Sequence, residues 1–195
     1  MAVRPPVARA ERASRPAPAT PPVAGAARGV TPATLRWFRA YSPYEPKPLG
    51  GHAVLTLVFN GWVAALAPEQ RRSGRELPER FPAGDLFLMS VGTYKLSRLI
   101  AKDRITSFVR APFTRFQGES DPPGEVSEEP RGSGMRRALG ELLVCPYCLG
   151  QWIGTGFLAV YLRDPRLART VASLFAVVAA SDLLHETWVA VDKRA

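Results

Sequence analysis

Two cysteines three positions apart carry the sharpest chemical pattern of the sequence. Cys145 and Cys148 are the only cysteines among its 195 residues, so a secreted type of disulfide framework cannot form. A Cys-x-x-Cys pair is a redox dithiol in glutaredoxins, where it starts a helix just after a buried strand. It is also half of a zinc site, which needs two further ligands. The residues before the pair, RRALGELLV, indicate a helix rather than a strand, which disfavours the redox interpretation.

Two polar residues downstream complete a hypothetical metal site. Counted from Pro165, Cys148 lies 17 residues before and Asp182 17 after, while Cys145 lies 20 before and His185 20 after. In an antiparallel helical hairpin all four side chains would lie at one depth, near the cytoplasmic side. The spacing therefore suggests a zinc site, and we expect no other cofactor. The alternative is that the cysteines are small buried hydrophobic residues.

Asp182 has a second interpretation, because it lies inside an apolar segment. A carboxylate at the centre of a spanning helix costs about 2.5 to 3.5 kcal/mol, so it needs a partner or water. Lys95, Arg98 or His185 could pair with it and lock two helices together. A proton or ion pathway would need further acidic sites at this depth, and Glu141 alone is weak support.

Basic residues cluster before the cysteines, and five of them form a candidate anion site. Clustered cations beside a membrane attract anionic phospholipid headgroups or phosphate. The same cations could instead form structural ion pairs, or simply set the topology. The five residues are Lys95, Arg98, Lys102, Arg104 and Arg110.

Long uncharged segments must position these residues. Residues 49–68 and 142–162 contain no formal charge, and each is long enough to cross a hydrocarbon core. With two weaker segments, the predicted spans are 49–68, 84–101, 138–162 and 167–191. The expected fold class is all-α, an integral membrane bundle of about four transmembrane helices. A soluble helical bundle is the alternative.

The remaining sequence divides by composition. Residues 1–30 are rich in Ala, Pro and Arg, which predicts a disordered tail without the apolar core of a signal peptide. Residues 31–48 predict a short juxtamembrane helix and turn, and 49–191 the membrane domain. Residues 117–134 combine acidic residues with Pro and Gly, which predicts a polar cytoplasmic loop.

Charge counts give an orientation. Eight Lys and Arg precede residue 51, and seven lie between Lys102 and Arg137, against four and three in the other two connectors. The positive-inside rule then places both termini in the cytoplasm, in a multi-pass protein of the cell membrane. The net charge of +9 does not indicate nucleic-acid binding, because the stacking aromatics and basic stripe of a folded reader are missing.

Three blocks in order carry a family resemblance: TYKLSRLIAKDRITSFVRAPFTRF (93–116), EVSEEPRGSGMRRALGELLVCPYCLGQWIG (125–154) and the hairpin that follows. Together they resemble the bacterial membrane-protein family known as domain of unknown function 1360. The resemblance covers about residues 50–190, and its most specific element is Cys-x-x-Cys-Leu-Gly-x-Trp, which ends at Trp152. It implies membrane residence in a bacterial cell and no established activity.

The sequence therefore predicts a structural or interaction component of the bacterial cell membrane, with no evident enzymatic activity. The lipid bilayer is its expected partner, and anionic phospholipids are a candidate; self-association stays open. A thiol-redox or metal-binding protein using Cys145 and Cys148 is the main alternative. An anionic-lipid or ion-handling protein is a further alternative.

Overall fold

The computed structural model describes residues 41–42, 45, 47–74, 77–120 and 123–193. The predicted tail 1–30 lies outside the described residues, as does most of the predicted juxtamembrane segment 31–48. Within the described part the chain is mostly helical, as predicted for an all-α protein, and it also contains a small two-stranded sheet.

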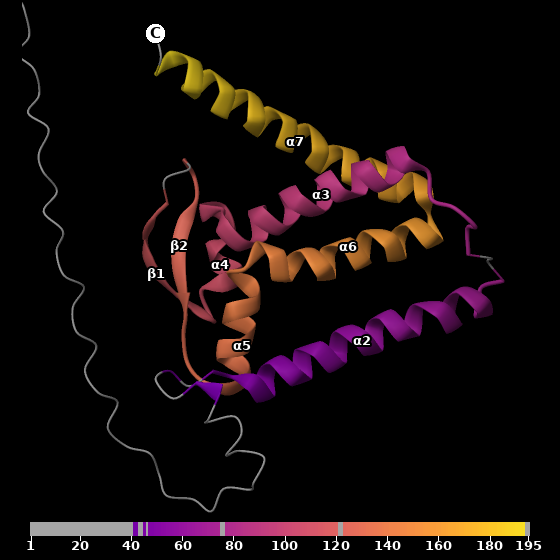
Figure 1. The fold of residues 1–195 in the computed structure, drawn as a ribbon, viewed down its shortest axis with the longest axis horizontal. Helices are drawn as coiled ribbons and strands as arrows, with labels where there is room; N and C mark the ends of the chain where they lie inside the picture. The colour runs from indigo at the N-terminus through magenta and orange to yellow at the C-terminus, as the bar shows by residue number, and fades with distance from the viewer. Residues whose placement is uncertain (1–40, 43–44, 46, 75–76, 121–122, 194–195) are drawn as a thin grey trace, which may run out of the picture.

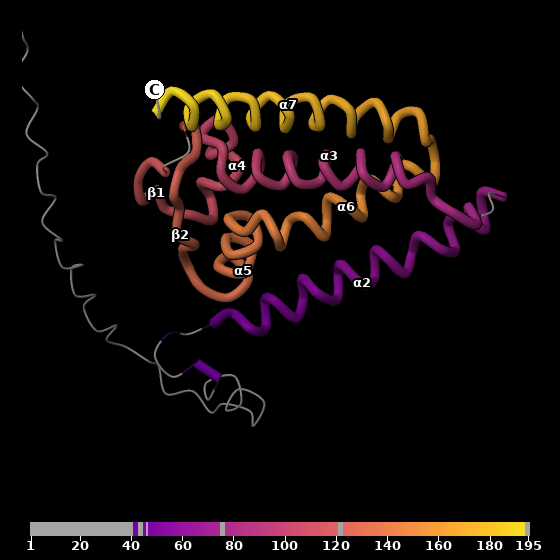
Figure 2. The backbone as a smooth tube through the Cα atoms, turned by 45° about the horizontal axis from the view of Figure 1, so that its top comes forward, coloured from indigo at the N-terminus to yellow at the C-terminus, as the bar shows by residue number. Residues whose placement is uncertain are grey.

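Four long helices run side by side, and smaller elements gather at one end of them (Figures 1 and 2). The long helices are α2 (Leu49–Arg72), α3 (Ala83–Lys102), α6 (Pro146–Arg163) and α7 (Pro165–Asp192). The smaller elements are η1 (Arg104–Thr106), α4 (Ser107–Arg110), β1 (Thr114–Glu119), β2 (Val126–Pro130) and α5 (Gly134–Leu143). We call their end the hairpin end, and the opposite end, with connector 73–82 and Asp164, the turn end. The start of α2 and the end of α7 both lie at the hairpin end (Figure 1).

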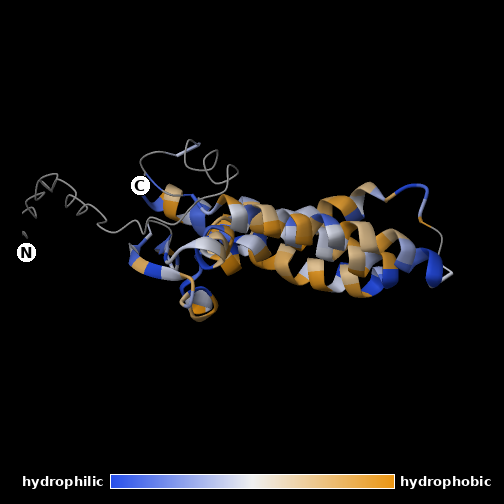
Figure 3. Cartoon of the chain, turned by 90° about the horizontal axis from the view of Figure 1, so that it is seen from below, coloured by the Kyte–Doolittle hydropathy of each residue, from blue (hydrophilic) through white to orange (hydrophobic). Residues whose placement is uncertain are grey.

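Two of the four predicted spans meet the length and hydropathy of a membrane helix on their own. These are α2 and α7, and α5 with α6 makes a third if the bent pair counts as one span. The 24 residues of α2 measure about 36 Å, which exceeds a hydrocarbon core of about 30 Å. The exception is α3, whose C-terminal half carries Lys95, Arg98 and Lys102. In Figure 3 apolar residues dominate along the helices and polar residues gather toward the two ends.

The predicted span 138–162 is not one continuous helix, because the chain bends by 81° between α5 and α6. Cys145 is extended at φ −104° and ψ 101°, and Pro146 is the first residue of α6. Proline lacks the N–H that would continue a helix and pushes the residue before it out of the helical region. The uncharged run hides this break, since hydropathy does not register a change of direction.

The predicted loop 117–134 is also wrong, because it contains most of a β-hairpin. β1 and β2 pair antiparallel, with Arg115 opposite Glu129 and a register shift between Phe116 and Gly118. Acidic residues with Pro and Gly are typical of solvated loops, which explains the misassignment. Here the glutamates of the hairpin meet cations from the preceding basic residues, and these ion pairs stabilise the strands.

The core lies where α3, α6 and α7 meet. Met89, Phe157, Tyr161, Ala168 and Ala172 form its buried cluster. Gly92 of α3 faces this cluster, and a Cβ added there would lie 3.2 Å from the Cα of Ala172 and 3.3 Å from the ring of Phe157. A residue without a side chain therefore allows α3 to approach both neighbours closely.

Replacing Gly92 should weaken this packing. Gly92→Leu is expected to destabilise the purified protein by about 1 to 3 kcal/mol, because the side chain overpacks the contact between α3 and α7. Thermal unfolding in detergent, followed by helical circular dichroism, measures the effect. Gly61→Leu is the matched control, since a Cβ at Gly61 meets nothing within 4 Å. Equal losses in the two variants would contradict a specific close approach at Gly92.

Candidate functional site

The predicted anion-binding residues are mostly engaged in ion pairs within the protein. Of the five, Lys102 alone has no acidic partner in the part of the chain that the structure describes. The other four residues therefore form ion pairs within the protein, which is one of the alternatives considered for this basic cluster. Their pairs are Lys95–Asp182 at 2.7 Å, Arg98–Glu125, Arg104–Glu119 at 2.7 Å and Arg110–Glu128 at 2.9 Å.

Arg110 is the centre of these pairs and is fully buried, at 0% exposure. Its Nε and Nη2 atoms donate to the two carboxylate oxygens of Glu128 at 3.0 and 2.9 Å, which is the bidentate geometry of a guanidinium and a carboxylate. Its remaining bonds go to the carbonyls of Ile100 (2.6 Å) and Asp103 (3.0 Å) and to the hydroxyls of Thr106 (2.8 Å) and Ser107 (3.1 Å). Such complete pairing is what allows a charged side chain to be buried.

The hairpin supplies the counter-charge in an environment that favours its ionised form. Burial by itself raises the pKa of Glu128, but hydrogen bonds from Arg110 and Thr114 outweigh it and hold the pKa below its ordinary value of 4.5. The Thr114 hydroxyl donates to Glu128 at 2.7 Å. No role was predicted from the sequence for the glutamates of this hairpin. The signal that could have indicated ion pairs was their position shortly after a series of Lys and Arg residues.

Asp182 confirms the expected lock between helices. The Lys95 ammonium on α3 contacts its carboxylate at 2.7 Å, and this ion pair joins α3 to α7. Lys95 is largely covered, with a side chain that is 12% exposed. This is one of the three partners that the sequence suggested.

The four hypothetical zinc ligands do not come together. No group of three or more His, Cys, Asp or Glu side chains that could hold a metal ion occurs among the described residues. The hairpin count assumed straight helices facing one another, whereas Asp182 turns to Lys95 of α3. His185 is exposed on the last turns of α7, and Cys145 and Cys148 lie at the bend between α5 and α6.

The Cys145 thiol caps the start of α6. The Cys148 N–H donates to Cys145 Sγ at 3.2 Å, so the sulfur takes the position of a helix-capping acceptor. Both cysteines are free thiols, and Cys148 is exposed. Their proximity follows from the Cys-x-x-Cys spacing and by itself shows no redox role.

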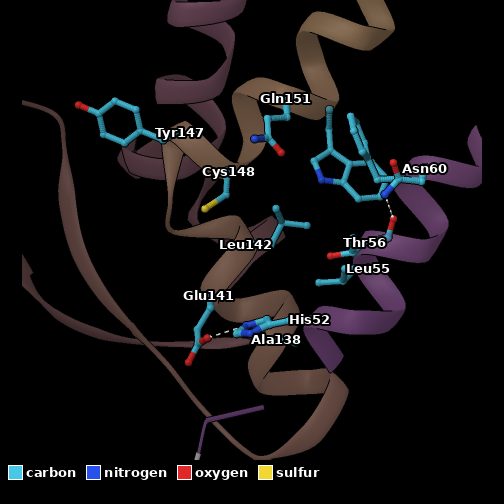
Figure 4. Close-up of a pocket in the computed structure, with 12 residues that line it drawn as sticks. His52, Leu55, Thr56, Asn60, Ala138, Glu141, Leu142, Tyr147, Cys148 and Gln151 are labelled. Atoms are coloured by element: carbon cyan, nitrogen blue, oxygen red, sulfur yellow. Dashed lines mark hydrogen bonds and ion pairs between the residues drawn. The ribbon is translucent and has the colours of Figure 1, made fainter. Parts of the chain in front are cut away.

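A cleft of about 670 Å³ lies between α2 and the α5–α6 bend (Figure 4). On its wall His52 of α2 pairs with Glu141 of α5 at 2.8 Å, which joins the two helices. The Asn60 amide donates to the Thr56 carbonyl of its own helix at 2.8 Å. From α6 the cleft receives Cys148, Gln151 and Trp152. The cleft was not predicted, because it depends on the bend.

A second set of polar contacts closes the turn end. Asp85 at the start of α3 accepts hydrogen bonds from Tyr161 Oη at 2.6 Å and from Arg169 Nη2 at 2.7 Å. Arg163 pairs with Glu69 of α2. Two of the three arginines counted against the predicted orientation are therefore neutralised by acidic partners.

Comparison with known proteins identifies the family of the chain. The family described as "Protein of unknown function (DUF1360)" matches residues 88–188. The chain belongs to this family. The DUF1360 match includes α3 from Leu88, the hairpin, the bend and most of α7, whereas α2 precedes it. The ion pairs around Arg110 thus lie in the family's part of the chain, and the α2 wall of the cleft lies outside it.

Two relatives of this DUF1360 protein come from Bacillus subtilis (strain 168). The chain is 33% identical to the UPF0713 protein YngL over 102 residues, which cover 50% of this chain and 73% of YngL. It is 28% identical to the sporulation protein YjcA over 102 residues, which cover 51% of this chain and 86% of YjcA. No solved structure matches the chain.

Removing one member of the buried pair should be far more costly than removing an exposed one. Arg110→Met is expected to destabilise the protein by about 3 to 5 kcal/mol, because the buried Glu128 carboxylate is left without a cation to compensate its charge. Arg104→Met is the control and should cost less than about 1 kcal/mol, since that pair is exposed. Thermal unfolding in detergent compares the two. The double variant Arg110→Met/Glu128→Leu should recover part of the loss, and its failure to do so would contradict an uncompensated charge.

Stability should also fall with acidification. The pKa of Glu128 is lower in the folded protein than in the unfolded chain, so its contribution is complete above a pH of about 4.5 and is lost as the pH falls through the folded value. The thermal midpoint of the wild type is therefore expected to drop between about pH 5 and pH 3. Glu128→Gln should start lower and show a smaller drop. An equal drop in both proteins would assign the pH dependence to other groups.

Proposed function

We propose that this protein is a multi-pass component of the bacterial cell membrane with a structural or interaction role and without enzymatic activity. The observation that carries the proposal is the apolar surface of α2 and α7. Only 6% of the apolar window of α2 and 17% of that of α7 is buried in the protein. Leu57, Leu174 and Val177 are each more than 60% exposed. Exposure of an apolar surface of this extent to water is unfavourable, whereas a bilayer covers it.

We include α3 and α6 among the crossing helices, which gives four. The charges of α3 lie toward its ends and have partners that reduce their cost in a membrane. Asp85 pairs with Arg169 at the turn end, and Lys95 and Arg98 pair with Asp182 and Glu125 toward the hairpin end. A paired charge near a helix end is tolerated far better than a lone charge at mid-membrane.

We assign the hairpin end, with both termini, to the cytoplasm. Seven Lys and Arg lie between Lys102 and Arg137, which favours retention of this segment inside the cell. At the turn end the acidic partners of Arg163 and Arg169 offset part of the opposing positive charge. Of the five predicted residues, Lys102 would be the one to meet anionic phospholipids, since the other four have acidic partners among the described residues.

Single-cysteine labelling tests the four-helix arrangement. In a variant with Cys145 and Cys148 replaced by serine, Glu79→Cys reports the turn end and Ser127→Cys the hairpin end; both positions are exposed. A membrane-impermeant maleimide should label Glu79→Cys in intact cells, and Ser127→Cys only after permeabilisation. Labelling of neither site in intact cells would contradict the crossing, and the reversed pattern would contradict the orientation. Release of the protein by carbonate washing would overturn membrane residence.

A further inference from the structure

The cleft between α2 and α6 presents polar groups from both helices. His52, Thr56 and Asn60 recur every four residues and therefore lie on one face of α2. His52 and Asn60 already have partners. The Thr56 hydroxyl and the Gln151 carboxamide are exposed, line the cleft and make no side-chain hydrogen bond within the described part of the chain, so both are free to bind a molecule that enters from the bilayer (Figure 4). In an apolar environment an unpaired amide or hydroxyl is costly, so a molecule that supplies hydrogen-bonding atoms is favoured here.

The charge of the cleft limits the chemistry of such a molecule. The carboxylate of Glu141 on its wall pairs with His52 at 2.8 Å and with Arg137 at 3.1 Å, so its charge is compensated within the described residues. No unpaired cation of the described residues faces the cleft to hold a phosphate. This disfavours a phospholipid headgroup and favours an uncharged polar group.

Aromatic rings form the rest of the wall. Phe59 and Trp152 line the cleft with centroids 5.2 Å apart, and Trp62 stacks on Trp152 at 6.1 Å. Such rings offer flat surfaces to a planar ligand. A volume of about 670 Å³ accommodates a small-molecule head together with the start of an apolar tail.

We propose that this cleft binds an isoprenoid quinone, a membrane-soluble amphiphile with an uncharged, planar head and two carbonyl acceptors. The Gln151 amide and the Thr56 hydroxyl are the donors for its carbonyls, and Phe59 and Trp152 contact its ring. The tail leaves toward the lipid that covers α2. This inference rests on the proposed function, because it requires α2 and α6 to lie in the membrane.

Equilibrium binding of menaquinone-4 to the full-length protein in detergent micelles tests the site. Bound quinone is extracted from immobilised protein and quantified by absorbance, against micelles without protein. We expect saturable binding of about one quinone per chain. Gln151→Leu should weaken it about tenfold through loss of one hydrogen bond, and Thr56→Val should act in the same direction. Gln117→Leu makes the same chemical change on the exposed hairpin and should bind like the wild type.

Three outcomes would overturn the proposal. The first is the absence of saturable binding above that of empty micelles. The second is binding that neither Gln151→Leu nor Thr56→Val weakens, although both variants elute as folded protein. The third is displacement of the quinone by equimolar diacylglycerol or phosphatidylglycerol. The carbonate wash distinguishes failure of the quinone site from failure of the proposed membrane location. A protein that remains in the membrane pellet but fails these tests loses only the quinone site.

Discussion

The buried pair of Arg110 and Glu128 is the constraint on which the hairpin end depends. A guanidinium without access to water must have its donors satisfied, because each unpaired one carries a desolvation penalty. The acceptors come from the end of α3, from η1, from α4 and from β2. The hydrogen bonds from Arg110 to these acceptors hold four separate elements in one arrangement. This one side chain therefore joins the short helices and the hairpin to the end of α3.

The same pairing changes the interpretation of the basic cluster as an anion site. Cations beside a membrane attract anionic lipids only as far as protein carboxylates leave their charge uncompensated. Arg98, Arg104 and Arg110 meet glutamates of the hairpin, and Lys95 meets Asp182. The basic residues of α3, η1 and α4 therefore join these elements to the hairpin and to α7. A short charged hairpin, connected in sequence to α3, acts as its local counter-ion.

The bend at Cys145 has the second large effect on the architecture. Because Pro146 starts a new helix, α5 leaves the axis of α6 by 81° and reaches the beginning of α2. There Gly51 lies so close to Ala138 that a Cβ would approach its side chain to 2.6 Å, and Glu141 reaches His52. The α2 helix is thus held at the hairpin end while its middle contributes to the cleft. Cys145 and Cys148 lie at this bend because Pro146, which starts α6, stands between them in the sequence.

The sequence alone determined the helical class, the apolar span at residues 49–68, the family and the need of Asp182 for a basic partner. These properties follow from local composition and periodicity, and from the cost of a lone carboxylate in an apolar segment. Tertiary structure decided that Lys95 is that partner, that residues 117–134 contain strands and that the span 138–162 is broken. It also separated Cys145 and Cys148 from Asp182 and His185. Helix rotation, ion-pair choice and the direction of a bend depend on residues distant in the chain, so hydropathy and spacing could not specify them.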